Sequence, residues 1–551
     1  MGTIGFDTIG DCMIGLLYSR RWLRSTLVLS ASVFALAAHP ARADSLAEAI
    51  GDAYRSNPGI QAQRAALRAL DESYVQARAQ FGLQANAQFG DSYSRVDRGG
   101  LGPPFGSGGV YKAETSNVGV SLQQPIYTGG RFSARANAAE NDIMAGRENL
   151  RRAELDLILR VVNAYVGVRR DEKVLEITRD TVKVLTQQLA DTRAKFEVRQ
   201  VTATDVAQSE ARLAQSKTQL VNAQAQLNVT RSQYVALVGR NPENLEPEPA
   251  FDSLPPTIDH AFDAAEELNP TLLAAKFTEA ASRARVAEAR AGRLPTVVLR
   301  ADRSRGPTLP YSPKPYDDSF SVQAVVSQPL FTSGQISSAI RQALEQNNRD
   351  RLNVEDLRRN VVQTVSQAWE ALASSRDTLS SIETEMRSDE TAFYGVREEE
   401  RVGLRSNIEV LNAQQELTQA QLALVRTRAN EYASRVQLLA LTGVLNVDTL
   451  SPEAEAYDPA KNFRRVKNRF ALPWEFPLRA MDRLAGPPIG GPRAADTKEA
   501  QRPSSIGPMP PPPPAPADAS PITSITTIMA RTGQAPSDAP PAPDAPIATG
   551  R

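Results

Sequence analysis

The spacing of apolar positions changes twice in each half of the chain, from helical to alternating and back to helical. In the alternating segments apolar and polar residues take turns, as they do in strands with one apolar and one polar face. This pattern predicts strands at about residues 83–96, 112–124, 296–305 and 318–328. Alternation alone does not decide between an antiparallel sheet in water and the lipid-facing wall of a barrel.

Each pair of predicted strands is followed by a very long tract without proline and then by a shorter helical segment. The predicted helices cover about residues 131–197, 204–239, 336–402 and 408–443. At 1.5 Å per residue, the two longest would be rods of about 100 Å. The shorter helices carry a heptad pattern with large residues at one seam position and small residues at the other, which favours close packing of helices into a wall. An ordinary helical hairpin is the alternative.

The whole series of elements occurs twice in nearly constant register. Gln124-Pro125-Ile126-Tyr127 is matched by Gln328-Pro329-Leu330-Phe331, and Asp205 is matched by Glu409, in both cases 204 residues later. A period of this length excludes the short-period solenoids and indicates two copies of one large structural unit.

The first 43 residues are predicted to be a secretory signal peptide. Three arginines precede a short apolar run, and Ala41-Arg42-Ala43 forms a cleavage pattern at its end. Translation begins at either Met1 or Met13.

The remaining chain divides into segments of different composition. The predicted segments are a first repeat (44–240), a proline-rich linker (241–256), a second repeat (257–446), a C-terminal extension (447–484) and a Pro/Ala-rich tail (485–551). The extension is basic and contains Trp474, and we expect it to pack on the body or to contact a surface. The tail is expected to be disordered.

Composition excludes several function classes. Lys plus Arg and Asp plus Glu number 63 each, so no excess of positive charge points to nucleic acid. The single cysteine, Cys12, and His39 lie in the predicted signal peptide, which leaves only His260. Disulfides, Cys/His zinc sites and Cys–His catalysis are thereby excluded. No paired carboxylates stand out either, so we expect no catalytic residue, metal or cofactor, and no enzyme activity.

These motifs, in this order, resemble the TolC family of outer-membrane channel proteins over about residues 45–446. The resemblance rests on Asn57-Pro58, on the two Gln-Pro motifs, of which the first is followed by Gly129-Gly130, and on Val402-Gly403-Leu404 before Glu409. It implies an α+β membrane protein with two structural repeats, each a long α-helical hairpin plus a β-hairpin. Three copies would form a 12-stranded β-barrel continued by an α-helical barrel.

The resemblance also implies a function. A trimeric channel-tunnel in the outer membrane, extending into the periplasm, would serve as exit duct for type I protein secretion, multidrug efflux or both. The implied partners are two further copies of the chain, a periplasmic adaptor (membrane fusion) protein, an inner-membrane ABC or RND transporter, and outer-membrane lipid. The alternative is a secreted coiled-coil structural or adhesive protein without a pore, which would lack the strand hairpins.

By resemblance, a periplasmic gate lies where the long helices turn into the short ones. The implied gate residues are Thr204, Asp205, Arg405, Glu409 and Asn412. Glu409 matches a constricting acidic position, whereas Asn412 falls on a second acidic position and carries no charge. Arg405 matches an arginine that holds the closed state by bonding Thr204 and Asp205 on the neighbouring turn. Glu400 stands where some members have a latching tyrosine.

The same turns are the implied adaptor-docking tips. The implied docking residues are Val198, Arg199, Val402, Gly403 and Leu404. Arg199 departs from the pattern, because a glycine would ease a tight turn there. Three copies of Glu409 near one axis would attract cations and raise carboxylate pKa values. In the alternative interpretation, the charges at these turns are ordinary solvated residues at helix ends.

Overall fold

The structure is a computed structural model, and all the residues that it describes lie in one unit within 43–551. It describes residues 44–99, 109–249, 254–307, 315–445, 450–451, 456–469, 471–484, 486–489, 502–503 and 507–511. The predicted signal peptide and most of the predicted tail therefore lie outside the described residues.

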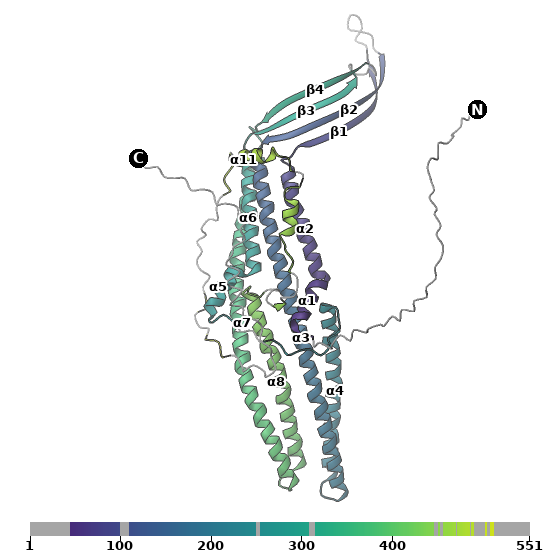
Figure 1. Cartoon of the computed structure of the whole chain (residues 1–551), viewed down its shortest axis with the longest axis vertical. Helices are drawn as coiled ribbons and strands as arrows, with labels where there is room; N and C mark the ends of the chain where they lie inside the picture. The colour runs from purple at the N-terminus through teal and green to yellow at the C-terminus, as the bar shows by residue number, and fades with distance from the viewer. Residues whose placement is uncertain are drawn as a thin grey trace, which may run out of the picture. The chain divides into compact units, whose positions relative to one another are not determined.

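The two halves of the chain contain the same elements in the same order (Figure 1). The first half has α1 (Leu46–Ser56), α2 (Pro58–Ala79), β1 (Gln84–Arg98), β2 (Gly109–Tyr127), α3 (Arg131–Glu197) and α4 (Ala203–Val238). The second half has α5 (Ile258–Leu268), α6 (Pro270–Ala291), β3 (Thr296–Pro307), β4 (Tyr316–Ser327), α7 (Gln335–Arg401) and α8 (Asn407–Leu441). Both α3 and α7 have 67 residues, which makes each a rod of about 100 Å.

The Asn-Pro pairs mark the starts of α2 and α6, for a local physical reason. The Asn57 side chain accepts a hydrogen bond from the backbone N–H of Gly59, and Asn269 accepts one from that of Thr271. The prolines that follow occupy the first helical position, where a missing N–H leaves no hydrogen bond unmade. None of the described helices combines the length and the apolar character that crossing a bilayer requires.

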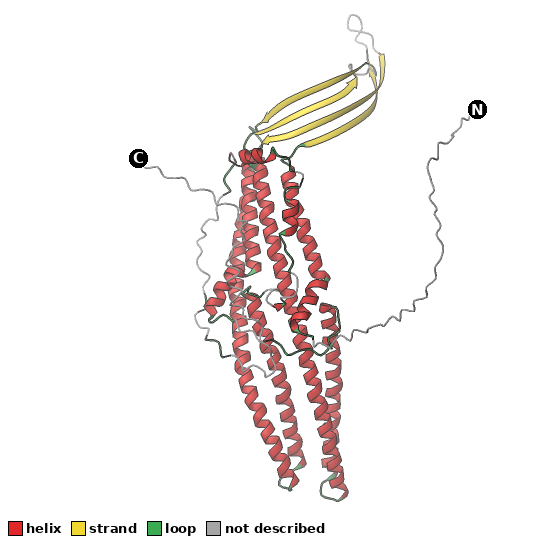
Figure 2. Ribbon diagram, viewed as in Figure 1, coloured by secondary structure: helices red, strands yellow, loops and turns green. Residues whose placement is uncertain are grey.

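The four strands form one antiparallel sheet in the order β1-β2-β3-β4 (Figure 2). One face carries the row of paired residues Ala85, Leu122, Ala301 and Val322, and the other carries Asn86, Ser121, Asp302 and Ser321. The sheet therefore has one apolar and one polar face, as the alternation predicts. Large side chains on the apolar face lie bare in the single chain.

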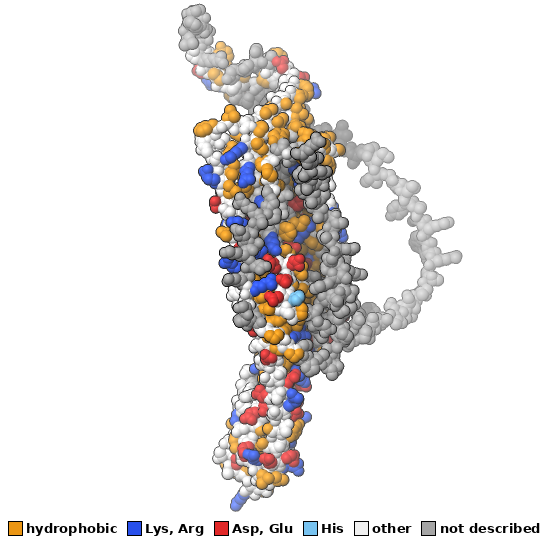
Figure 3. Space-filling model, turned by 90° about the vertical axis from the view of Figure 1, so that its left-hand side faces the viewer, with side chains coloured by type: hydrophobic (Ala, Val, Ile, Leu, Met, Phe, Trp, Pro, Cys, Tyr) orange, Lys and Arg blue, Asp and Glu red, His pale blue; other side chains and the backbone are white. Residues whose placement is uncertain are grey.

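Phe89 on β1 is 75% exposed and Phe320 on β4 is 73% exposed. On the side of the molecule seen in Figure 3, hydrophobic side chains gather toward the sheet end, whereas basic and acidic side chains are intermixed at the far end of the helices. Bare apolar side chains thus occur on the strands and, at Leu330 and Phe331, at their junction with the helices.

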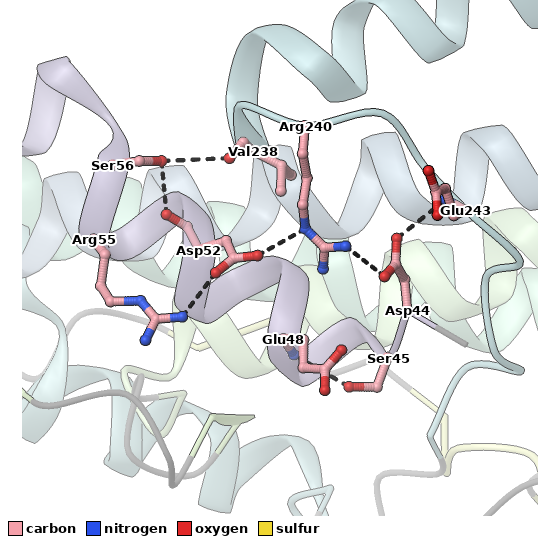
Figure 4. Close-up of polar contacts among 9 residues, drawn as sticks. All are labelled: Asp44, Ser45, Glu48, Asp52, Arg55, Ser56, Val238, Arg240 and Glu243. Carbon is pink, nitrogen blue, oxygen red and sulfur yellow. Dashed lines mark hydrogen bonds and ion pairs between the residues drawn. The ribbon is translucent and has the colours of Figure 1, made fainter. Parts of the chain in front are cut away.

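A polar cluster ties the start of the described chain to the end of the first repeat (Figure 4). Arg240, just after α4, donates to the Asp52 carboxylate through Nε at 2.7 Å and also pairs with Asp44. The hydroxyl of buried Tyr165 on α3 donates to the backbone carbonyl of Asp44 at 2.8 Å. The Tyr165 hydroxyl also donates to the carbonyl of Glu246 in the predicted linker at 2.8 Å, so the linker is held against α3 beside the largest apolar core of the helical body.

The C-terminal extension packs on the first repeat through α10 (Lys461–Val466) and α11 (Glu475–Leu484). Buried Arg78 on α2 donates to the backbone carbonyls of Lys467 and Arg469, both at 2.6 Å. Of the two alternatives that the sequence leaves open for the extension, packing on the body is therefore observed for α10.

Short described pieces of the predicted tail lie against the helical body. Trp369 Nε1 donates to the carbonyl of Gly507 at 3.3 Å, and Arg376 Nη1 donates to that of Pro510 at 2.7 Å. Arg502 pairs with two aspartates of α5. Proline-rich backbone makes no internal hydrogen bonds, so its carbonyls are available to donors on the helical body.

The two otherwise similar halves differ at the junction between the strand and the long helix. Gly130 before α3 and Gly334 before α7 both have left-handed backbone, with φ of 78° and 83°. A Cβ on Gly130 would lie 2.7 Å from the Cα of Gly486, whereas one on Gly334 would meet nothing within 4 Å. Among the described residues, α11 and Gly486 just after it cover the junction of the first repeat and not that of the second.

This difference supplies a matched pair of variants. Gly130→Ala and Gly334→Ala should each lose about 1–2 kcal/mol through left-handed strain. Only Gly130→Ala should also displace Gly486 and α11, because only there does the new methyl group collide with Gly486, just after α11. Hydrogen exchange of residues 475–486 in the purified full chain should therefore accelerate in Gly130→Ala and stay as in the wild type in Gly334→Ala. Equal exchange in the two variants would contradict this packing.

Candidate functional site at the helical tips

The two turns that join the long helices to the short ones have the same backbone. Arg199 and Gly403 occupy the same position, 204 residues apart, and have positive φ of 60° and 80°. In each turn the next amide donates to the carbonyl five residues earlier at 2.9 Å. Arg199 departs from the pattern in sequence but not in backbone, and it adopts the left-handed conformation at a cost of about 1–2 kcal/mol.

Bare apolar side chains surround these turns. Val198, Val402 and Leu404 are all exposed in the single chain. Apolar groups gathered at a water-exposed end are typical of surfaces that contact a partner. The structure therefore places the predicted docking residues at the ends of both helical hairpins, and their docking role stays a prediction.

The acidic residues of the tips cap the short helices. Asp205 accepts hydrogen bonds from the backbone N–H and the hydroxyl of Thr202, at 2.8 and 2.7 Å. Glu409 accepts from the same two groups of Ser406, both at 2.8 Å. Thr202 and Ser406 are again 204 residues apart, so both copies contain one capping box. Helix capping explains why an acid occurs at both positions.

Arg405 forms ion pairs within the second tip, the turn between α7 and α8. Its Nε donates to Glu399 at 2.8 Å and its Nη1 donates to Glu409 at 2.9 Å, so it joins the end of α7 to the start of α8. Within this chain it makes no described contact with Thr204 or Asp205. Contact with those residues in another copy of the chain stays a prediction.

These bonds lower the pKa of Glu409 to about 2, because the Ser406 N–H, the Ser406 hydroxyl and the Arg405 guanidinium all favour the charged carboxylate. The Thr202 N–H and hydroxyl likewise lower the pKa of Asp205. The sequence-based expectation of a raised pKa depends on three neighbouring copies. In the single chain the local donors act in the opposite direction.

Two polar contacts connect the helical hairpins of the two repeats at this end. Lys195 near the end of α3 pairs with Glu400 near the end of α7. Arg212 on α4 donates through Nη2 to the Asn412 side chain on α8 at 3.2 Å. Glu400 thus makes a bond between the repeats at the position where some TolC family members have a latching tyrosine, and uncharged Asn412 serves as an acceptor.

A third contact is buried. The Asn407 side chain, at the start of α8, accepts from Gln188 Nε2 at 2.9 Å and donates to the Ser209 hydroxyl at 3.0 Å. Gln188 lies on α3 and Ser209 on α4, so Asn407 joins the second hairpin to both helices of the first. We call these three contacts, made by Lys195–Glu400, Arg212–Asn412 and Asn407 with Gln188 and Ser209, the hairpin latch.

Sequence reasoning missed most of the hairpin latch. Asn412 was identified as a gate residue and Glu400 as a departure from the family pattern, but Lys195, Gln188 and Asn407 carried no signal of their own. Ser209 occupies one of the small seam positions of the heptad, which is a weak indication of close helix contact. Among the described residues no group of histidine, cysteine, aspartate and glutamate side chains could hold a metal ion.

Residues 49–240 and 261–444 match the model of the outer membrane efflux protein family. The chain belongs to this family. The outer membrane efflux protein BepC of Brucella suis is 28% identical over 458 residues, which cover 83% of this chain and 96% of that protein. The TolC protein of Escherichia coli is 26% identical over 74% of this chain and 84% of its own length. The alkaline protease secretion protein AprF of Pseudomonas aeruginosa is 25% identical over 59% of this chain and 69% of its own length.

Solved structures show the same fold. The outer-membrane channel OprN superposes with a TM-score of 0.64 at 18% identity, over 72% of this chain and 89% of its own. The CmeC outer-membrane channel of Campylobacter jejuni also gives 0.64, at 14% identity, over 78% of this chain and 90% of its own.

Membership of the outer membrane efflux protein family confirms the α+β two-repeat fold, the outer-membrane location and the function as an export channel. The family is one of channel proteins. The alternative of a secreted coiled-coil protein without a pore is therefore set aside.

The hairpin latch predicts how firmly the tips of one chain are held together. Glu400→Gln should remove the half of the ion pair that lies deeper and lower the free energy of local opening by about 1 kcal/mol. Amide exchange at the end of α7 should then accelerate about fivefold. Glu398→Gln is the matched control, because among the described residues Glu398 forms an ion pair with Arg401 of the same helix and none with the other hairpin. Equal exchange in the two variants would show that the pair across the hairpins contributes nothing.

Proposed function

We propose that three copies of this chain form a 12-stranded barrel in the outer membrane, continued by an α-helical tunnel in the periplasm. The observation that carries the proposal is the four-stranded sheet with free edges at β1 and β4 and a bare apolar face. In lipid every unpaired backbone group costs several kcal/mol, so an open sheet of four strands is not viable there. Pairing β4 of one copy with β1 of the next removes all the edges.

The two faces of the sheet fit this assembly. The face with Leu122 and Val322 meets lipid, and the face with Asn86 and Asp302 lines a water-filled lumen. The family is one of channel proteins, so we infer that the chain is not an enzyme and that the energy for export comes from a partner.

The periplasmic end carries the proposed gate. The hairpin latch holds the second hairpin against the first, and Arg405 with Glu409 stiffens the tip that has to move. Thr204 and Asp205 lie at the matching tip of the first hairpin, where the Arg405 of a neighbouring copy would meet them. Opening then consists of separating the hairpins. This breaks the three contacts of the hairpin latch and separates Leu411 of α8 from the buried leucines of α3 and α4.

The proposed trigger is the docking of a periplasmic adaptor protein. The surface of this chain on which the adaptor would dock consists of the apolar tips and the groove between the hairpins. The groove is lined by residues of α3, α7 and α8 that include Lys183, Gln187, Asp191, Phe393, Arg397 and Val410. An inner-membrane ABC or RND transporter would drive export through the adaptor. One relative is a protease secretion protein and another an efflux protein, which supports a duct for protein secretion, multidrug efflux or both.

Planar-bilayer recording tests the channel and its gate. The purified full chain should give discrete conductance that prefers cations. The double variant Glu400→Gln with Asn407→Ala should conduct several times more, because it removes two of the three contacts of the hairpin latch. Arg405→Ser should also raise the conductance by loosening its own tip. Glu398→Gln should conduct like the wild type. Protein without discrete conductance would overturn the channel assembly, and unchanged conductance in the double variant would overturn the gate.

The preference for cations should persist in acid. The pKa of Glu409 in the single chain is lowered to about 2, so its carboxylate stays charged from neutral pH down to about pH 3 and is neutralised only below that. Ser406→Ala removes the hydroxyl donor and should shift the loss of cation preference to higher pH. Glu409→Gln should reduce the preference at every pH. A wild-type preference that disappears near pH 5 would instead indicate that three like charges raise the pKa.

A further inference from the structure

Helix α11 turns its acidic residues toward the protein and its large apolar residues outward. Glu475 and Asp482 are 4% and 0% exposed, whereas Leu484 is 87% exposed and Phe476 and Met481 are also bare. A helix on the surface of a protein in water has the opposite orientation. The bare side of α11 therefore needs a cover other than water.

This orientation is fixed by buried hydrogen bonds. Asp482 Oδ1 accepts from the backbone N–H of Thr128 at 2.6 Å, from the Thr128 hydroxyl at 3.0 Å and from the Gly130 N–H at 3.2 Å. Its Oδ2 accepts from the Ser133 hydroxyl at 3.2 Å. A carboxylate is held strongly at this place because the N–H groups at the start of α3 carry partial positive charge. Rotating α11 to hide its apolar side would leave this charge buried without partners.

The bare side of α11 continues the apolar face of the sheet. Trp474, directly before α11, places its Nε1 3.5 Å from Gln124 Oε1 on β2. Gln124 is two residues from Leu122 and pairs with Leu299, so its side chain lies on the apolar face. Trp474 thus lies at the end of that face that is nearest the helices, where the barrel would meet the periplasm.

The exposed charge of this segment is of one sign. Between residues 461 and 484 the only acids are Glu475 and Asp482, and both are buried. The basic residues in the same range include Arg465 and Arg483, which are exposed. Positive charge beside a bare apolar helix and a tryptophan is typical of helices that lie in a membrane surface.

We propose that α11, with Trp474, lies in the periplasmic leaflet of the outer membrane. The side chains of Trp474, Phe476, Met481 and Leu484 enter the boundary between head groups and acyl chains, while Arg483 faces lipid phosphates. The ligand is an anionic phospholipid of the bilayer. The inference rests on the proposed barrel, which puts the apolar face of the sheet in the same bilayer. It gives each copy an anchor outside the barrel wall.

A neighbouring copy is the competing cover. Leu330 and Phe331, at the junction of the second repeat, are bare in the single chain and would lie near the β1 side of the next copy. They offer apolar surface but no negative charge for the basic residues of the extension. Lipid supplies both, and for this reason we assign the cover to lipid.

Tryptophan fluorescence tests the assignment. Outside the predicted signal peptide the chain has only Trp369 and Trp474, and Trp369 is buried in the helical body. The wild type and Trp474→Phe are reconstituted into vesicles of phosphatidylethanolamine and brominated phosphatidylglycerol. Bromine quenches tryptophan on contact, so about half of the wild-type emission should be lost and that of Trp474→Phe should be unaffected. Bromine near the head groups should quench more than bromine deep in the chains.

Charge reversal provides the second arm. Arg483→Glu should reduce quenching by brominated phosphatidylglycerol more than quenching by brominated phosphatidylcholine, because only the former carries net negative charge. Unquenched Trp474 in vesicles where the protein still conducts would overturn this inference, assign the cover to a neighbouring copy and leave the channel intact. Absence of conductance as well would overturn the proposed function itself.

Discussion

The unpaired backbone groups at the edges of β1 and β4 are the constraint on which the rest of the structure depends. A four-stranded sheet with one bare apolar face is stable neither in water nor as an open sheet in lipid. The closure by three copies that we propose would solve both problems at once. It also sets the symmetry of everything below the sheet, because each strand pair continues into one long helix. The two repeats of each chain then provide six similar hairpins around one axis.

Much of this architecture could be predicted from local patterns. Proline-free tracts give α3 and α7 almost to the residue, and alternation gives the strands. The first hairpin is longer than predicted, since β1 and β2 pair as far as Arg98 with Gly109. Backbone pairing near a hairpin loop needs no apolar side chains. The alternation of apolar and polar residues therefore ends before the hydrogen-bonded strand pairing ends. The family match explains the remaining success, because order and spacing of weak motifs are specific where each motif alone is not.

The contacts that sequence could not predict join residues far apart along the chain. Asp482 binds the Gly130 amide across 352 residues, and Lys195 meets Glu400 across 205. Such pairs leave no period in the sequence, because each depends on the completed packing of several helices. The acidic residues at the helical tips, by contrast, make local contacts that the sequence does indicate. Glu409 matches a gate position of the family, yet its immediate contacts are those of a helix cap. The same residue can therefore cap α8 within one chain and contribute to the proposed gate between chains.

The two repeats share a backbone and differ in what is attached to it. Arg199 adopts the same left-handed conformation as Gly403, although only glycine adopts it without steric strain. A duplicated chain nevertheless has one C-terminus, so the extension can cover the strand–helix junction of only one repeat. Three copies therefore present three junctions held by Asp482 and three without it. The symmetry falls from sixfold to threefold at the membrane boundary by chain connectivity alone. At the tips it falls because Lys195 and Glu400, which occupy equivalent ends of the two long helices, carry opposite charges.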